Sequence, residues 1–210
     1  MKTRRKTKAS NSASESSEPR LKPPPRSYRC MSRGLEPGEA AQSFELPNAN
    51  QSVGGSDLAL SDVLTDVGAV VMFTCNHCPY VVGSEARIEQ MAAKARAAGL
   101  GFVGINSNDP VMYQSDDWSH MVKRADTMSY PYLHDASQQV ASSWGAERTP
   151  EFYLLAGDGT VTYRGRLDDS PQNPRMASTA ELSDAIDAML AGSSPQVTRT
   201  DSIGCSVKWK

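Results

Sequence analysis

The stretch Phe73-Thr74-Cys75-Asn76-His77-Cys78-Pro79-Tyr80 decides the fold of this chain. An apolar run at 69–73 leads into the first cysteine, and such a run is typical of a buried strand. A helix-forming stretch follows at 84–98, so the Cys-x-x-Cys spacing lies between a strand and a helix. This context turns a common spacing into the hypothesis of a redox site. The free N–H groups and the dipole at a helix start favour an anion, and a cysteine there loses its proton more easily.

The residues between the two cysteines indicate which sulfur reacts. His77 directly precedes Cys78, so we expect Cys75 to be the exposed, attacking cysteine and Cys78 to be its more buried partner. An imidazole near the Cys75 sulfur would stabilise its thiolate and make the pair more oxidising. The alternative for His77 is an ordinary polar residue at a helix start.

The cysteine count indicates a reducing compartment. The chain has four cysteines, at positions 30, 75, 78 and 205, which is too few for a secreted scaffold held by disulfides. We therefore expect transient, catalytic disulfides and a cytoplasmic protein. No apolar run reaches the roughly eighteen residues of a membrane span, and no secretory signal follows the first basic residues.

Residues 1–33 differ in composition from the rest of the chain. They hold ten Lys or Arg and two Glu, a net charge of +8, whereas the remainder has 12 bases and 22 acids, a net charge of −10. With Pro23-Pro24-Pro25 and no apolar periodicity, the segment is predicted to be a disordered basic tail. The alternatives are an arm for nucleic acid or a membrane surface, an organelle transit peptide, or an extension before a true start at Met31. We expect neither nucleic acid nor a membrane as a partner.

The rest of the sequence predicts one α/β domain at 34–195 and a C-terminal extension at 196–210. The expected strands lie at 69–74, 100–106, 130–133, 151–155 and 161–165, and the expected helices at 84–98, 115–125, 137–144 and 179–190. This order implies a central mixed sheet with helices on both faces. Site residues then gather at the carboxyl ends of the parallel strands, where Cys75 and Asn106 are expected.

The extension has a pattern of its own. Ile203, Val207 and Trp209 alternate with polar residues, which suits docking as an edge strand. A docked extension would bring Cys205 near the Cys-x-x-Cys motif, where it could act as a resolving cysteine. The alternative is a surface cysteine on a loose end.

Several motifs together resemble the thioredoxin superfamily. The order of Cys75-x-x-Cys78, then Thr149-Pro150 before a hairpin, then a final helix is similar to that superfamily. The resemblance implies a thioredoxin-like fold in which Pro150 is cis and lies beside the redox cysteines. The lead-in Gly38-x-x-Ala41-x-x-Phe44-x-Leu46 resembles the redoxin branch, which includes the alkyl hydroperoxide reductase/thiol-specific antioxidant family.

Further segments resemble a peroxiredoxin-like subgroup within that branch, and the resemblance extends over 34–210. The matching segments are Cys75-Asn76-His77-Cys78-Pro79-Tyr80, Ile105-Asn106-Ser107-Asn108-Asp109, Arg166-Leu167-Asp168-Asp169 and Ile203-Gly204-Cys205-Ser206-Val207-Lys208-Trp209-Lys210. The chain also departs from the related patterns. Neither cysteine has the Thr or Ser that precedes a peroxidatic cysteine by three residues, and Arg148 is one residue away from the position of the peroxide-activating arginine. Ala69 replaces the buried acid of thioredoxin, so no base for the second cysteine is evident.

Three functions are open at this point. The first is a thiol–disulfide oxidoreductase with an antioxidant role, in which Cys75 attacks, Cys78 resolves, and Thr149, Pro150 and Asn106 shape the substrate groove. Its partners would be protein or small-molecule thiols and disulfides, with an external thiol as reductant and no cofactor. The second is a thiol-dependent peroxidase, in which a sulfenic acid on the first cysteine is resolved by the second or by the cysteine of the extension.

The third function is a non-enzymatic metal module built on Cys75, His77, Cys78 and Cys205. One Cys-x-x-Cys supplies half of a zinc site, and a second paired half is absent from the sequence. We therefore expect no metal.

Overall fold

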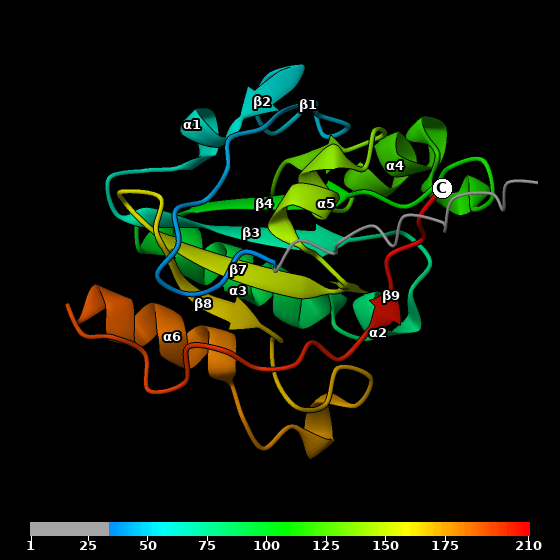
Figure 1. Ribbon diagram of the computed structural model, residues 1–210. Helices are drawn as coiled ribbons and strands as arrows, with labels where there is room; N and C mark the ends of the chain where they lie inside the picture. Colours follow the sequence, from blue (N-terminus) through cyan, green and yellow to red (C-terminus); the bar gives the residue numbers. More distant parts are fainter. Residues whose placement is uncertain (1–33) are drawn as a thin grey trace, which may run out of the picture. The chain divides into compact units, whose positions relative to one another are not determined.

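The computed structural model describes residues 34–210, so the predicted basic tail at 1–33 and its Cys30 lie outside the described residues. The centre of the fold is a five-stranded sheet with the order β5-β4-β3-β7-β8 (Figure 1). Four strands run in one direction and β7 is antiparallel to them, so the sheet is mixed, as the sequence predicted. Its strands are β3 (Gly68–Thr74), β4 (Gly101–Asn106), β5 (Tyr132–His134), β7 (Glu151–Ala156) and β8 (Val161–Gly165).

Strand β3 is the central strand, and all seven of its residues are buried. It pairs in parallel with β4, where Val70 is opposite Phe102, and antiparallel with β7, where Val70 is opposite Leu154. A strand that is covered on both faces has a continuous apolar sequence, which explains the run at 69–73.

Two hydrophobic cores form, because successive side chains of β3 point to opposite faces of the sheet. On one face Phe73 packs against Trp144 and Tyr153, with ring centroids 5.9 and 5.7 Å away. On the other face Val70 and Met72 belong to the second core. The central strand is therefore held rigidly from both sides, and its carboxyl end is a firm base for the residues that follow.

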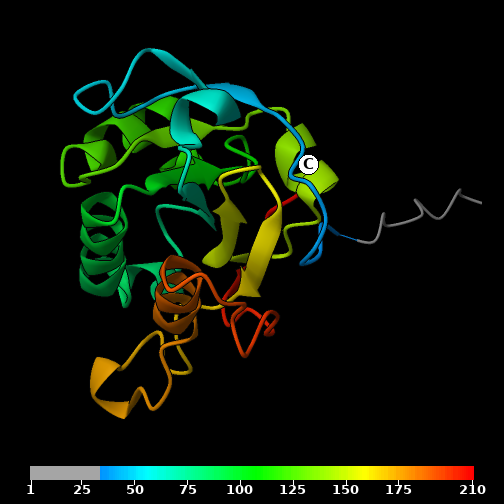
Figure 2. The same cartoon turned by 90° about the vertical axis from the view of Figure 1, so that its left-hand side faces the viewer.

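Helices cover both faces of the sheet (Figures 1 and 2). Helices α3 (Glu85–Ala97) and α6 (Glu181–Leu190) contribute their buried residues to the second core. Helix α5 (Gln139–Trp144) and the single turn α1 (Leu60–Val63) contribute to the first core. Helix α4 (Trp118–Ala125) packs beside β5 at the edge of the sheet.

Shorter elements surround this framework. β1 (Glu45–Pro47) pairs antiparallel with β2 (Asp57–Ala59), and β6 (Arg148–Thr149) pairs antiparallel with β9 (Cys205–Ser206). The remaining short helices are α2 (Pro79–Val82), η1 (Gln114–Asp116) and η2 (Pro174–Met176). Within residues 34–210, every helix is too short or too polar to cross a membrane.

Residues 204–210 form a segment that we call the C-terminal strap. Its strand β9 lies beside α2 (Figure 1), and its last residue, Lys210, binds Gln138 and Ala136 at the start of α5. The docking that the alternating pattern predicted is confirmed by the pairing of β9 with β6. Of the three apolar residues in that pattern, only Val207 is buried, and Trp209 is 44% exposed. The strap is therefore held mainly by its backbone.

Candidate functional site

The Cys-x-x-Cys motif lies where the chain passes from β3 into α2. Cys75 directly follows the strand, and Cys78 is the N-cap residue of α2, with Pro79 next. The Cys78 carbonyl accepts hydrogen bonds from the N–H groups of Val81 (3.0 Å) and Val82 (2.9 Å). The expectation that Cys75 lies at the helix start is therefore wrong. Proline suits the first helical position, where its missing N–H costs least, and so Pro79 sets the cap at Cys78.

The Thr149–Pro150 peptide bond is cis, as the resemblance implied, and Thr149 contacts both sulfurs. Its Oγ1 atom is 3.4 Å from Cys75 Sγ. In the fully protonated form, the S–H of Cys78 donates to the Thr149 carbonyl oxygen at 3.1 Å. The structure thus brings Cys75, Cys78, Thr149 and Pro150 together, and the role of the last two in a substrate groove stays a prediction.

Both cysteines of the motif are buried, with exposed fractions of 1% for Cys75 and 0% for Cys78. The expectation of an exposed Cys75 is therefore wrong. The reason lies in a distant part of the chain, because Cys205 of the strap packs on the cluster of Cys75, Cys78 and Val81. The three cysteines in the described part of the chain are free thiols. The strap therefore covers part of the cluster that contains the paired sulfurs.

The neighbours of the two sulfurs shift the pKa values of Cys75 and Cys78 in opposite directions. A hydrogen bond from the Cys75 thiol lowers the pKa of Cys78 to about 4, against the opposing effect of burial, and the thiol and backbone N–H of Cys205 act in the same direction. The same bond, together with burial and the charge of Asp116, raises the pKa of Cys75. One shared hydrogen bond thus shifts the pKa values of the two cysteines in opposite directions. The expected thiolate at Cys75 stays a prediction, which the charge of Asp116 opposes and the hydroxyl of Thr149 supports.

That carboxylate, Asp116, is a site residue that sequence reasoning missed. It is fully buried at the end of η1 and accepts hydrogen bonds from the Asn76 backbone N–H (2.7 Å) and from the side chains of Asn106 (3.1 Å) and Asn108 (2.9 Å). Nothing in its local sequence marks it, since the segment 115–125 was predicted as an ordinary helix. The one available signal was the expectation that Asn106 lies at the same sheet edge as Cys75.

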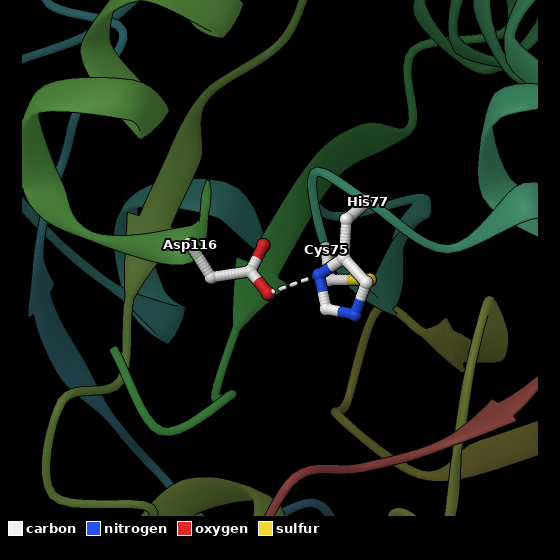
Figure 3. Close-up of side chains that lie close together, drawn as sticks. All are labelled: Cys75, His77 and Asp116. Atoms are coloured by element: carbon white, nitrogen blue, oxygen red, sulfur yellow. Dashed lines mark ion pairs between the residues drawn. The ribbon is translucent and has the colours of Figure 1, made fainter. Parts of the chain in front are cut away.

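His77 lies between this carboxylate and the first sulfur (Figure 3). Its Nδ1 is 2.6 Å from Asp116 Oδ2, an ion-pair contact in which the ring N–H is not aimed well enough for a hydrogen bond. The imidazole also stacks on Tyr113, with ring centroids 5.4 Å apart and an interplanar angle of 6°. The prediction that His77 is near the Cys75 sulfur is confirmed, and the ring is held there from two sides.

Asn106 stabilises the Cys-x-x-Cys motif through hydrogen bonds. Its amide donates to Asp116 and to the Tyr132 hydroxyl (3.0 Å), which in turn donates to Asn76 Oδ1 at 2.7 Å. Burial raises the pKa of Tyr132, so its hydroxyl stays protonated and can donate. Because Asn106 itself is fully buried, the expectation that it lines an open groove is wrong. It fixes the residue between the two cysteines instead.

Three side chains of this site could approach one metal ion. Cys75, His77 and Asp116 each offer one ligand atom, and these atoms all lie within 4.8 Å of one another. Thiolate, imidazole and carboxylate are ligands that zinc accepts, but a structural zinc site takes four. Both oxygens of Asp116 already accept hydrogen bonds, from three N–H groups in all.

The family model for Redoxin matches residues 36–182, which include the motif, the cis peptide bond and the hairpin. The chain belongs to the Redoxin family. It is an oxidoreductase. This redoxin is 38% identical to an uncharacterized conserved protein from Geobacillus kaustophilus, with a TM-score of 0.78 over 85% of this chain and 94% of that chain.

Two further solved structures are similar to this redoxin. A hypothetical protein from Sinorhizobium meliloti 1021 is 33% identical, with a TM-score of 0.76 over 84% of this chain and 96% of that chain. The peroxidoxin BcpB from Mycobacterium tuberculosis is 22% identical, with a TM-score of 0.52 over 75% of this chain and 97% of that chain. At that identity the likeness concerns the fold alone, and the thioredoxin-like architecture agrees with it.

Proposed function

We propose that this redoxin is a thiol–disulfide oxidoreductase that works through Cys75 and Cys78. The observation that carries the proposal is that both free sulfurs contact Thr149 beside a cis peptide bond, at the carboxyl end of the central strand. Thiol–disulfide exchange moves electrons between sulfurs, so this function requires no cofactor. The substrates would be protein or small-molecule disulfides, with an external thiol as reductant. An antioxidant role would follow from the repair of oxidised thiols.

Cys78 is the better nucleophile of the two. It carries the lowered pKa and stands at the start of α2, where the helix end favours an anion. Its thiolate attacks one sulfur of the substrate disulfide, a bond forms between Cys78 and that sulfur, and the other sulfur leaves as a thiolate. The order of attack that the sequence suggested is thereby reversed in our proposal.

Cys75 then resolves the mixed disulfide. Its thiol must lose a proton before it can attack Cys78 Sγ, and the ring of His77 lies next to it with the Asp116 carboxylate behind. We assign proton acceptance to this pair, which supplies a base in a chain where Ala69 replaces the buried acid of thioredoxin. The attack forms the Cys75–Cys78 disulfide and releases the substrate as a dithiol. The external thiol reduces the pair again.

The test is a disulfide reduction assay on the purified full chain, with insulin as substrate and dithiothreitol as reductant. Cys78→Ser should abolish turnover, whereas Cys75→Ser should accumulate a mixed disulfide between Cys78 and the substrate. Ser206→Ala is the control, because Ser206 is an exposed neighbour of the site with no sulfur contact. Turnover by the Cys78→Ser variant at the wild-type rate would sink the proposal.

A peroxidase is the second candidate, favoured by one observation. A thiolate at the start of a helix can attack hydrogen peroxide as well as a disulfide. The arginine that would activate peroxide is not in place, since the Arg148 guanidinium binds the carbonyl of Gly204 at 3.0 Å on the exposed side. Peroxide consumption with dithiothreitol, compared with insulin reduction by the same sample, decides between the two.

A further inference from the structure

The C-terminal strap lies where an extended substrate would pair with this enzyme. Its strand β9 is antiparallel to β6, and Cys205 is directly opposite Thr149, the residue before the cis bond. An exposed strand edge of this kind binds extended peptides through main-chain hydrogen bonds. In this chain the edge is occupied by the chain's own strap, and the residue that faces the redox pair is a cysteine.

The approach of the strap is unusually close. A Cβ atom on Gly204 would lie 2.1 Å from the Thr149 carbonyl oxygen, so only glycine fits at this position. The next residue, Cys205, thereby packs on the sulfur cluster that contains Cys78. Further along, the Lys208 N–H donates to Asn108 Oδ1 at 2.9 Å, and the Lys208 carbonyl accepts from the Asp109 N–H at 2.8 Å. The sulfur of Cys205 is thus positioned by contacts on both sides of it.

We propose that Cys205 is a third redox sulfur of this enzyme, and that it forms a disulfide with Cys78 that closes the strap over the site. The proposal rests on the proposed function of Cys78 as the exchanging sulfur. The bond is chemically equivalent to the mixed disulfide with a substrate, so the strap is a tethered stand-in for the substrate.

The step needs no oxidant beyond the one that has already oxidised the pair. In the Cys75–Cys78 disulfide, the Cys205 thiolate attacks Cys78 Sγ. The Cys78–Cys205 bond forms, the Cys75–Cys78 bond breaks, and Cys75 leaves as a thiolate that takes up the proton released by Cys205. One disulfide and one thiol are present before and after the step, so no electrons are gained or lost.

The charge around Cys205 makes this step conditional on the oxidised state. Burial and the neighbouring Cys78 sulfur raise the pKa of Cys205 to about 11, whereas Lys208 and Arg148 act in the opposite direction. When Cys78 is part of a disulfide, its negative charge is gone and the two cations remain. Cys205 then ionises more easily, so exchange starts only after the pair has been oxidised.

The test oxidises the full chain with diamide, blocks the free thiols, and maps disulfides by mass spectrometry without reduction. Trypsin leaves Cys75 and Cys78 together in the peptide 34–87 and Cys205 in the peptide 200–208. A cross-link between these two peptides is the expected product in the wild type. It should become the main product in Cys75→Ser and disappear in Cys78→Ser, which assigns it to Cys78.

A second variant separates proximity from general reactivity. Gly204→Ala should lower the cross-link yield, because its Cβ pushes the strap away from Thr149. Gly55→Ala is its control, since the added Cβ there meets only an ordinary contact at 3.5 Å. Fully alkylated Cys205 in oxidised wild type and in Cys75→Ser would overturn the proposal. A chain that still reduces insulin would then retain the proposed function and lose only this inference, whereas loss of both would remove the function as well.

Discussion

Oδ2 of Asp116 lies 2.6 Å from Nδ1 of His77, and this contact joins the loop between the two cysteines to the short helix η1 after β4. The carboxylate is fully buried and the imidazole is half-buried, so both are partly screened from water. The ring lies beside the Cys75 sulfur (Figure 3). A thiol, an imidazole and a carboxylate in this order can move one proton away from the sulfur.

The first prediction concerns the Cys78 thiolate. In the reduced protein, its ultraviolet thiolate absorbance should persist as the pH falls and disappear near pH 4, since the pKa of Cys78 is lowered to about 4. Cys75→Ala removes the largest stabilising donor, so the pH of the transition should rise. Cys78→Ala should remove the transition altogether. A transition that vanishes in Cys75→Ala and survives in Cys78→Ala would assign the thiolate to the other sulfur.

The second prediction concerns Asp116. Asp116→Asn keeps the volume of the side chain but replaces one acceptor oxygen with a donor amide that faces other N–H groups. We expect a stability loss of about 1–3 kcal/mol in denaturant unfolding, the cost of an unsatisfied buried polar group. The mixed disulfide on Cys78 should also persist longer, because Cys75 loses its proton more slowly.

The matched control for this variant is Asp117→Asn. Asp117 is the N-cap residue of α4 and accepts from the His120 N–H, and asparagine caps helices as well as aspartate. The control should unfold and turn over like the wild type. Equal effects of both substitutions would show that the carboxylate charge of Asp116 has no special part in the reaction.

The third prediction separates the two contacts of His77. His77→Phe keeps an aromatic ring that can stack on Tyr113 but removes the nitrogen that faces Asp116. If the imidazole accepts the Cys75 proton, release of the mixed disulfide should slow by about 10²-fold or more. The attack by Cys78 should be nearly unchanged in rapid-mixing experiments. Resolution at the wild-type rate would return His77 to the role of an ordinary polar residue.

The fourth prediction concerns access to the sulfurs. Gly204→Ala should speed the alkylation of Cys78 in the reduced protein, because a strap that cannot approach Thr149 leaves the cysteine uncovered. Amide hydrogen exchange of residues 205–208 should also become faster. Gly55→Ala, far from the strap contacts, should alter neither rate. Unchanged alkylation of Cys78 in Gly204→Ala would show that the strap is not the barrier.

The fold was predictable because its strongest signals are local. The apolar run at 69–73 indicates a strand that is covered on both faces. The cis bond before Pro150 was expected from the resemblance to the thioredoxin superfamily. The site was predictable only in part. The residues that contact the Cys-x-x-Cys motif come from segments distant in sequence, so their positions depend on the tertiary fold. Asp116, for example, is placed by β4 and η1 together.

The proposed order of attack, with Cys78 before Cys75, differs from the order expected from the sequence for the same reason. From the sequence, Cys75 was expected at the helix start and the helix itself at 84–98. A separate single turn, α2, begins at Pro79 and makes Cys78 the cap. Burial of Cys75 also results from the strap, which is more than a hundred residues away along the chain. The alternating apolar pattern predicted that the strap docks, yet it gave no information on what it covers.

The strap has a consequence for how turnover responds to its surroundings. Its docking depends on hydrogen bonds and on the single buried side chain of Val207, so it opens at a far lower free energy than the sheet below it. The turnover rate of an active site under such a cover is limited by the fraction of molecules in which the strap is locally unfolded. Mild urea, at concentrations that leave the sheet intact, is therefore expected to accelerate this enzyme before it inactivates it.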